Sequence, residues 1–266
     1  MWRLLFIFSL GLLAMLCIPI AQAISFFLAA DVETWWSFSW IPPLEQFGFG
    51  VALFGSLAIC VCAVPLILTG GWSLAYQMSA EKRPVMKKLT LSVMQLWCAL
   101  PSVVLGVWAI SQFVPSMRYL FDGSGYGLLT AVVVLTLYLI PVAAMLFYGS
   151  YAEYLQKYAD LETSLRMNFR TKTKIFFISA KGQMVHILNY TFCRVFGETM
   201  LILMLSGNAP IIPDGILDPV RTMTATFALE AEYASELHEQ ALYGLMGLCF
   251  VILLTVLMIG RIADEK

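Results

Sequence analysis

An arginine and a glutamate, Arg194 and Glu198, stand four residues apart in the apolar stretch RVFGETMLILMLSGN. At this spacing two side chains lie on the same face of a helix, one turn apart. A guanidinium presents a rigid fork of N–H donors that suits phosphate-like oxyanions, and a neighbouring carboxylate can neutralise it until an anion arrives. The pair is therefore either a structural ion pair between helices or a gated anion site, and the residues alone favour neither.

The position of the pair makes both charges costly. Arg194 lies ten residues beyond Met184, where the apolar stretch begins. That is about 15 Å of helix, which reaches the middle of a hydrocarbon core about 30 Å thick. A lone arginine at that depth costs from ~3 kcal/mol on insertion scales to more than ~10 kcal/mol in simulations, and pairing with Glu198 lowers the cost. Tyr190 and Thr191 extend the predicted polar stripe on the same helix face.

Other chemistry is hard to place on this sequence. The six cysteines form no CxxC pair and no cluster with histidine, so neither a metal site nor a disulfide framework is predicted. His186 and His238 are isolated, and no nucleophile and base share a recognisable spacing. The GxxxxGK[ST] motif is absent, so we expect no ATP binding through a P-loop and no enzyme activity in this chain.

The elements that must position Arg194 and Glu198 are membrane helices. The 266 residues are 60% hydrophobic and 12% charged, with a mean hydropathy of +0.82, whereas soluble domains carry about 25% charged residues. We expect an all-α, polytopic membrane protein of one domain, because lipid offers backbone groups no partners. Six segments are long enough to span: 4–28, 47–77, 89–114, 127–148, 184–206 and 241–260. We expect the first to be an uncleaved helix rather than a signal peptide, because its apolar run continues to residue 30.

The basic residues predict the orientation. With the N-terminus inside, the cytoplasmic segments hold 13 of the 16 Lys and Arg residues, and the outer segments hold only Arg118 and Arg221. The positive-inside rule therefore places both termini in the cytoplasm. A basic loop, 149–183, is then cytoplasmic, and an outer loop covers 207–240. We expect the acidic run of that outer loop to be a solvated face; its members are Glu230, Glu232, Glu236 and Glu239.

The chain resembles PstC-type permeases, the membrane subunits of phosphate ABC importers. The C-terminal third carries the resemblance most specifically, in RVFGETMLILMLSGNAP, ILDPVRTMTATFALE and LHEQALYGLMGLCFVILL. Upstream, FGFGVALFGSLAICVCAVPL is similar to the glycine-containing second span of that family, and ALPSVVLGVWA to its P-S-V-V-x-G signature. The resemblance covers nearly the whole chain and is strongest over residues 194–230.

This resemblance implies a MetI-like permease fold in a bacterial inner membrane. It implies a substrate path that includes Arg194, Glu198 and Thr199, with Arg221 near the anion entrance. It also implies four kinds of partner: a second, PstA-like permease, an ATPase dimer that uses ATP and Mg²⁺, a periplasmic phosphate-binding protein, and membrane lipid. No nucleic acid and no cofactor bound by this chain are expected.

ABC importer permeases also carry a cytoplasmic E-A-A-x-x-x-G loop that docks on the ATPase. In this chain it falls on Glu162, Thr163, Ser164 and Asn168, with Ile178-Ser179-Ala180-Lys181 further on. The two alanines, the glycine and the final Leu-Pro of the motif are replaced. Asparagine tolerates the left-handed turn that glycine would make, so we expect the turn at Asn168 to survive. The alternative is a solvated basic loop.

Two alternatives to a phosphate permease remain open from the sequence. The same architecture could carry another tetrahedral oxyanion, such as sulfate. The departures in the cytoplasmic loop also fit a non-transporting membrane adaptor that relays phosphate status.

Overall fold

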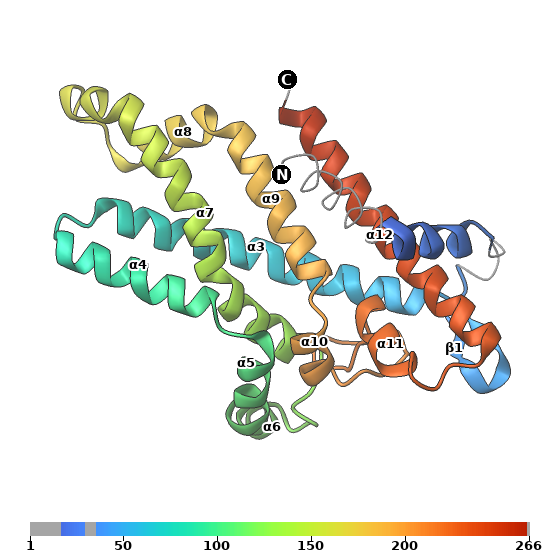
Figure 1. Ribbon diagram of the computed structural model, residues 1–266. Helices are drawn as coiled ribbons and strands as arrows, with labels where there is room; N and C mark the ends of the chain where they lie inside the picture. The colour runs from blue at the N-terminus through green and yellow to red at the C-terminus, as the bar shows by residue number, and fades with distance from the viewer. Residues whose placement is uncertain (1–16, 30–35, 265–266) are drawn as a thin grey trace, which may run out of the picture.

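The computed structural model describes residues 17–29 and 36–264, and this part of the chain is almost entirely helical (Figure 1). After a short helix, Cys17–Ala29, a hairpin pairs β1 (Trp40–Ile41) with β2 (Gln46–Phe47) across the 3₁₀ turn Pro42–Leu44. The helices that follow are α3 (Gly50–Ala80), α4 (Pro84–Cys98), α5 (Ser102–Trp108), a π-helical turn (Ala109–Phe113), α6 (Val114–Phe121), α7 (Leu128–Ser164), α8 (Phe169–Ser179), α9 (Lys181–Phe196), α10 (Met200–Leu205), α11 (Met223–Glu230) and α12 (Glu236–Asp264).

Four helical segments of the described residues are long and apolar enough to cross a membrane, and they are Gly50–Ala80, Ser102–Phe121, Leu128–Glu162 and Glu236–Ile262. The six predicted spans are therefore not all seen as single helices. Most of the predicted span 4–28 lies outside the described residues. The predicted span 184–206 is divided into α9 and α10. Six crossings stay a prediction.

The predicted span 89–114 is divided between two helices. α4 ends at Cys98 and α5 begins at Ser102, with Pro101 between them in an extended conformation (φ −62°, ψ 134°). Proline lacks an N–H and pushes the preceding residue out of the helical region, which explains the break. Pro65 and Pro141 lie inside α3 and α7, and those helices continue through them.

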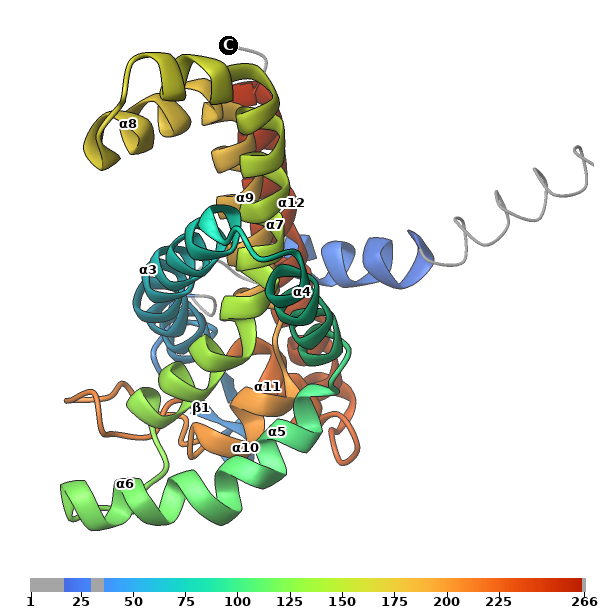
Figure 2. The ribbon, with the colours of Figure 1, turned by 90° about the vertical axis from the view of Figure 1, so that its left-hand side faces the viewer.

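α7 extends much further than the predicted span 127–148. It continues to Ser164, so nearly half of the predicted loop 149–183 belongs to a helix of 37 residues. The end of α7, α8 and the C-terminal end of α12 gather at one end of the molecule, while α6, α10, α11 and β1 lie at the other (Figures 1 and 2). The predicted topology requires the loop 149–183 and the C-terminus to lie at one end and the loop 207–240 to lie at the other. Which end faces the cytoplasm stays a prediction.

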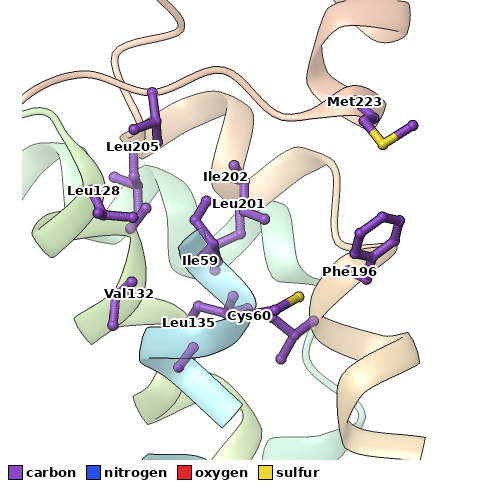
Figure 3. Close-up of a cluster of buried hydrophobic side chains, with 14 of the residues drawn as sticks. Ile59, Cys60, Leu128, Val132, Leu135, Phe196, Leu201, Ile202, Leu205 and Met223 are labelled. Atoms are coloured by element: carbon purple, nitrogen blue, oxygen red, sulfur yellow. The ribbon is translucent and has the colours of Figure 1, made fainter. Parts of the chain in front are cut away.

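The core that holds the polar pair forms where α3 and α7 pack together and α10 closes over them. α3 and α7 make the most extensive helix–helix contact in the described part of the chain. Figure 3 shows side chains of α3, α7, the end of α9, α10 and α11 meeting in one apolar cluster, with Ile59, Cys60, Leu128, Val132, Leu135, Phe196, Leu201, Ile202, Leu205 and Met223 labelled. This cluster anchors the chain on both sides of the break between α9 and α10.

The contact between α3 and α7 depends on a glycine, and this gives a first prediction. A Cβ atom at Gly71 would lie 2.7 Å from the Cβ of Ala143 and 3.0 Å from the backbone nitrogen of Ala144. The Gly71→Val change should therefore separate the helices and lower the stability by about 1–3 kcal/mol. Thermal unfolding of the purified chain in detergent measures the effect.

The matched control is Gly149→Ala in α7, where an added Cβ would meet nothing within 4 Å. Alanine stabilises a helix interior by about 0.5–1 kcal/mol relative to glycine, so this variant should be at least as stable as the parent. Equal stability of Gly71→Val and the parent would show that the two helices do not need this close approach.

Candidate functional site

Arg194 and Glu198 meet as the sequence predicts, but at a helix break rather than along one helix. Arg194 lies in the last turn of α9, Gly197 caps that helix, and α10 begins at Met200. The Nη1 atom of Arg194 donates to Oε2 of Glu198 over 2.5 Å. The end of α9 favours a cation there, because helix C-termini carry partial negative charge. The break therefore helps to stabilise the guanidinium.

The two partners differ in exposure. The Glu198 side chain is 3% exposed, whereas that of Arg194 is 35% exposed. The backbone carbonyl of Glu198 also accepts a hydrogen bond of 3.3 Å from the Thr224 hydroxyl, which ties the break to α11. The carboxylate is thus fixed and enclosed, while part of the guanidinium remains accessible. An anion could approach Arg194 without first displacing the protein backbone.

A third residue, Tyr138 of α7, completes the site, and the sequence analysis missed it. Its hydroxyl donates to the backbone carbonyl of Leu100 over 3.1 Å and lies 3.5 Å from Nη2 of Arg194. The Arg194 guanidinium carbon also stands 5.7 Å from the centre of the tyrosine ring, within the range of a cation–π contact. The Leu100 carbonyl lies at the Pro101 break, outside any helix, and so needs an outside donor. The sequence feature that could have identified Tyr138 is the presence of a tyrosine inside an apolar span.

Removing the Tyr138 hydroxyl should leave the Leu100 carbonyl without its donor. Because Leu100 is itself exposed, we expect Tyr138→Phe to lower the stability of the chain by about 0.5–1.5 kcal/mol, the usual net contribution of one hydrogen bond. Thermal unfolding in detergent checks this. Tyr119→Phe is the control, because Tyr119 is 89% exposed and its hydroxyl has little to lose. Equal melting temperatures for the two variants would show that the Tyr138 hydroxyl does not help to hold the site together.

The predicted polar stripe on α9 is not continuous. Thr191 is buried, whereas Tyr190 is 48% exposed and borders a separate groove. Thr199, the other predicted path residue, stands just before α10 and donates its hydroxyl to the Gly197 carbonyl over 3.4 Å. Among the predicted path residues, the one direct bond that the structure gives therefore joins Arg194 and Glu198.

Arg221 lies in a second ion pair, with Glu230. Its Nη1 atom is 2.5 Å from Oε1 of Glu230, and its Nε atom donates to the Asn208 carbonyl over 2.7 Å. The side chain is only 15% exposed. Arg221 is thus neutralised and largely enclosed, and its predicted place at an anion entrance stays a prediction.

The prediction that Glu230 belongs to a solvated acidic face is wrong. Glu230 is 3% exposed, and its Oε2 atom lies 2.8 Å from both Nε1 of Trp40 and Nε2 of His238. One carboxylate therefore joins the β1 hairpin, Arg221 in the loop before α11, and the start of α12. The sequence analysis described His238 as isolated, but the structure places it in this cluster. Glu232, Glu236 and Glu239 are exposed, as predicted.

The predicted ATPase-coupling residues lie around the turn between α7 and α8. Glu162 forms an ion pair of 2.8 Å with Lys172 of α8 and accepts a hydrogen bond of 2.8 Å from the Tyr154 hydroxyl. Ser164 is exposed at the end of α7, and Thr163 is helical. The turn is a helical hairpin held together by these contacts and by the stacked rings of Tyr151 and Phe176, whose centres are 3.9 Å apart.

The left-handed turn predicted at Asn168 occurs two residues earlier. Arg166 has a φ of +46°, whereas Asn168 has an extended backbone (φ −75°, ψ 164°) and serves as the N-cap of α8. Its side-chain oxygen accepts a hydrogen bond of 2.8 Å from the Thr171 N–H. Asparagine is among the preferred N-cap residues, so this replacement of the motif glycine has its own structural use.

A solved structure shares the fold. A chain of the MetNI methionine ABC transporter, in its inward-facing conformations, superposes with a TM-score of 0.65 at 14% identity, over 85% of this chain and 99% of that one. No family model matches the sequence. The described residues therefore share the fold of a permease subunit of an ABC importer.

The relatives of the chain agree on a narrower type. It is 24% identical to the phosphate transport system permease protein PstC of Pasteurella multocida, over 85% of this chain and 78% of that protein. It is 26% identical to the protein of the same name from Mesorhizobium japonicum, over 84% and 75%. The resemblance to PstC-type permeases is thus confirmed across most of the chain.

Proposed function

We propose that this chain is the permease subunit of an ATP-driven phosphate importer and forms the anion path with a second, PstA-like permease. The observation that carries the proposal is the Arg194–Glu198 pair, in which the carboxylate is buried and the cation is partly accessible at a break between two helices. The relatives named PstC support phosphate as the anion. An arginine suits phosphate because the N–H donors of the guanidinium fork match the phosphate oxygens.

In this proposal an incoming anion takes over the hydrogen bonds that Glu198 makes to Arg194. The enclosed carboxylate holds the guanidinium neutralised between transport events and prevents free leakage of anions. A periplasmic phosphate-binding protein delivers the anion, and a partner ATPase dimer hydrolyses ATP with Mg²⁺. The α7–α8 hairpin passes the motion of the ATPase to the spans, so that the site opens to one side at a time.

Uptake of labelled phosphate tests the proposal. The chain is expressed together with its proposed partner subunits in bacteria that lack their own phosphate importers. We expect uptake that requires this chain and that excess unlabelled phosphate abolishes. If sulfate competes at least as strongly as phosphate, the transported substrate is another tetrahedral oxyanion. The Arg194–Glu198 pair would suit any such anion.

Co-purification tests the second alternative, a membrane adaptor. The Glu162 carboxylate is already bonded to Lys172 and Tyr154 within the chain, and this leaves it less available for an ATPase. A transporter should nevertheless carry an ATPase through purification from detergent-solubilised membranes. Absence of any ATPase, together with absence of uptake, would favour the adaptor.

A further inference from the structure

A groove outside the Arg194–Glu198 site runs between α7, α9 and α12. Its cavity volume is about 740 Å³, within the range of small-molecule sites. α9 and α12 touch beside this groove, because a Cβ atom at Gly260 would overlap the Asn189 side chain.

The two ends of the groove differ in chemistry. Leu254, Leu257 and Met258 form an apolar wall on α12, and each is about half exposed or more. Arg261 and His186 border the other end. Arg261 follows Leu254 by seven residues, two helical turns, so it lies on the same face and about 10 Å further along the axis. The groove is thus amphipathic along its length.

The depth of these residues matches a membrane boundary. The part of α12 that is long and apolar enough to cross a membrane runs from Glu236 to Ile262, so we expect Arg261, one residue before its end, to lie near the lipid headgroups. Arg261 is exposed, and no described acidic residue forms an ion pair with it. Leu254 and Leu257 lie one to two turns deeper, at the level of acyl chains. Basic pockets of this kind between membrane helices bind anionic phospholipid headgroups.

We propose that this groove binds one anionic phospholipid, whose phosphate contacts Arg261 and whose acyl chain lies along Leu254, Leu257 and Met258. Charge complementarity and the apolar wall together favour this occupant. Inorganic phosphate would gain nothing from the wall. A partner helix would bury Arg261 against apolar side chains at a cost in free energy, because its charge would lose water without gaining a partner.

Native mass spectrometry of the detergent-solubilised complex tests the proposal with two lipids of identical acyl chains. Phosphatidylglycerol should remain bound in preference to phosphatidylcholine. Arg261→Gln should weaken phosphatidylglycerol binding about tenfold or more, the usual effect of losing a charge-assisted hydrogen bond. It should leave phosphatidylcholine unchanged. Arg261→Lys should retain much of the preference, because it keeps the charge.

Arg83→Gln is the matched control, because Arg83 is an exposed cation at the start of α4, away from the groove. It should bind both lipids like the parent. Leu257→Trp should fill the groove and reduce binding of both. The proposal is overturned if Arg261→Gln and Arg83→Gln have equal effects, if millimolar inorganic phosphate displaces phosphatidylglycerol, or if the lipid binds the isolated chain but not the complex.

Discussion

Cells that depend on this chain for phosphate should lose uptake when Arg194 is replaced by alanine. The guanidinium is the only partly accessible cation that the described residues place at the break between α9 and α10. Its charge-assisted hydrogen bonds to an oxyanion are worth about 1.5–3 kcal/mol each, so the loss of two should reduce uptake at least 100-fold. Labelled phosphate uptake in intact cells measures the effect. Arg194→Lys should retain a small fraction, since it keeps the charge but loses the fork.

The alanine variant also leaves the buried Glu198 carboxylate without its cation, which could impair folding. The double variant Arg194→Gln/Glu198→Gln removes both charges and separates the two effects. It should insert and assemble with its partners, as co-purification reports, yet fail to transport. Glu198→Gln alone should insert and transport more slowly or without coupling to ATP. Normal uptake by the double variant would reduce the pair to a packing role.

The Glu230→Ala change should cause the largest loss of stability among the acidic residues. Glu230 has three partners, which are Trp40, Arg221 and His238. Removing the carboxylate leaves the enclosed Arg221 charge uncompensated, and such losses cost about 3–5 kcal/mol. We expect a strongly reduced yield of folded chain and a lower melting temperature in detergent.

Glu232→Ala is the control for this prediction, because Glu232 belongs to the same acidic run but is exposed. Its effect should stay within about 0.5 kcal/mol. Similar losses for Glu230→Ala and Glu232→Ala would mean that the buried cluster contributes little. Glu230→Gln, which keeps the shape, should fall between the parent and the alanine variant.

The local parts of this structure could be predicted from the sequence. α3 and α12 coincide with long apolar runs, because length and composition decide which helices can cross lipid. The contact between Arg194 and Glu198 was predictable too, since four residues separate them and short-range geometry brings them together.

The parts that depend on distant partners could not be predicted. Pro101 stands between two helices whereas Pro141 lies inside one, and the local sequence does not distinguish the two prolines. The sequence predicts that Glu230 is a surface residue, because its partner Trp40 is 190 residues away and cannot be recognised from the local sequence. Hydropathy averages also miss a break such as that at Gly197, where the chain stays apolar while the helix stops.

The length of α7 has a mechanical consequence. The helix carries Tyr154, bonded to Glu162 near the α7–α8 turn, and sixteen residues earlier it carries Tyr138, next to Arg194. About 24 Å of one rod separate the two contacts. In the proposed importer, a push on the turn would reach Tyr138 along this helix. Pro141, which cannot bond to the carbonyl of Leu137, lies between the two contacts, so we expect the helix to bend most easily there.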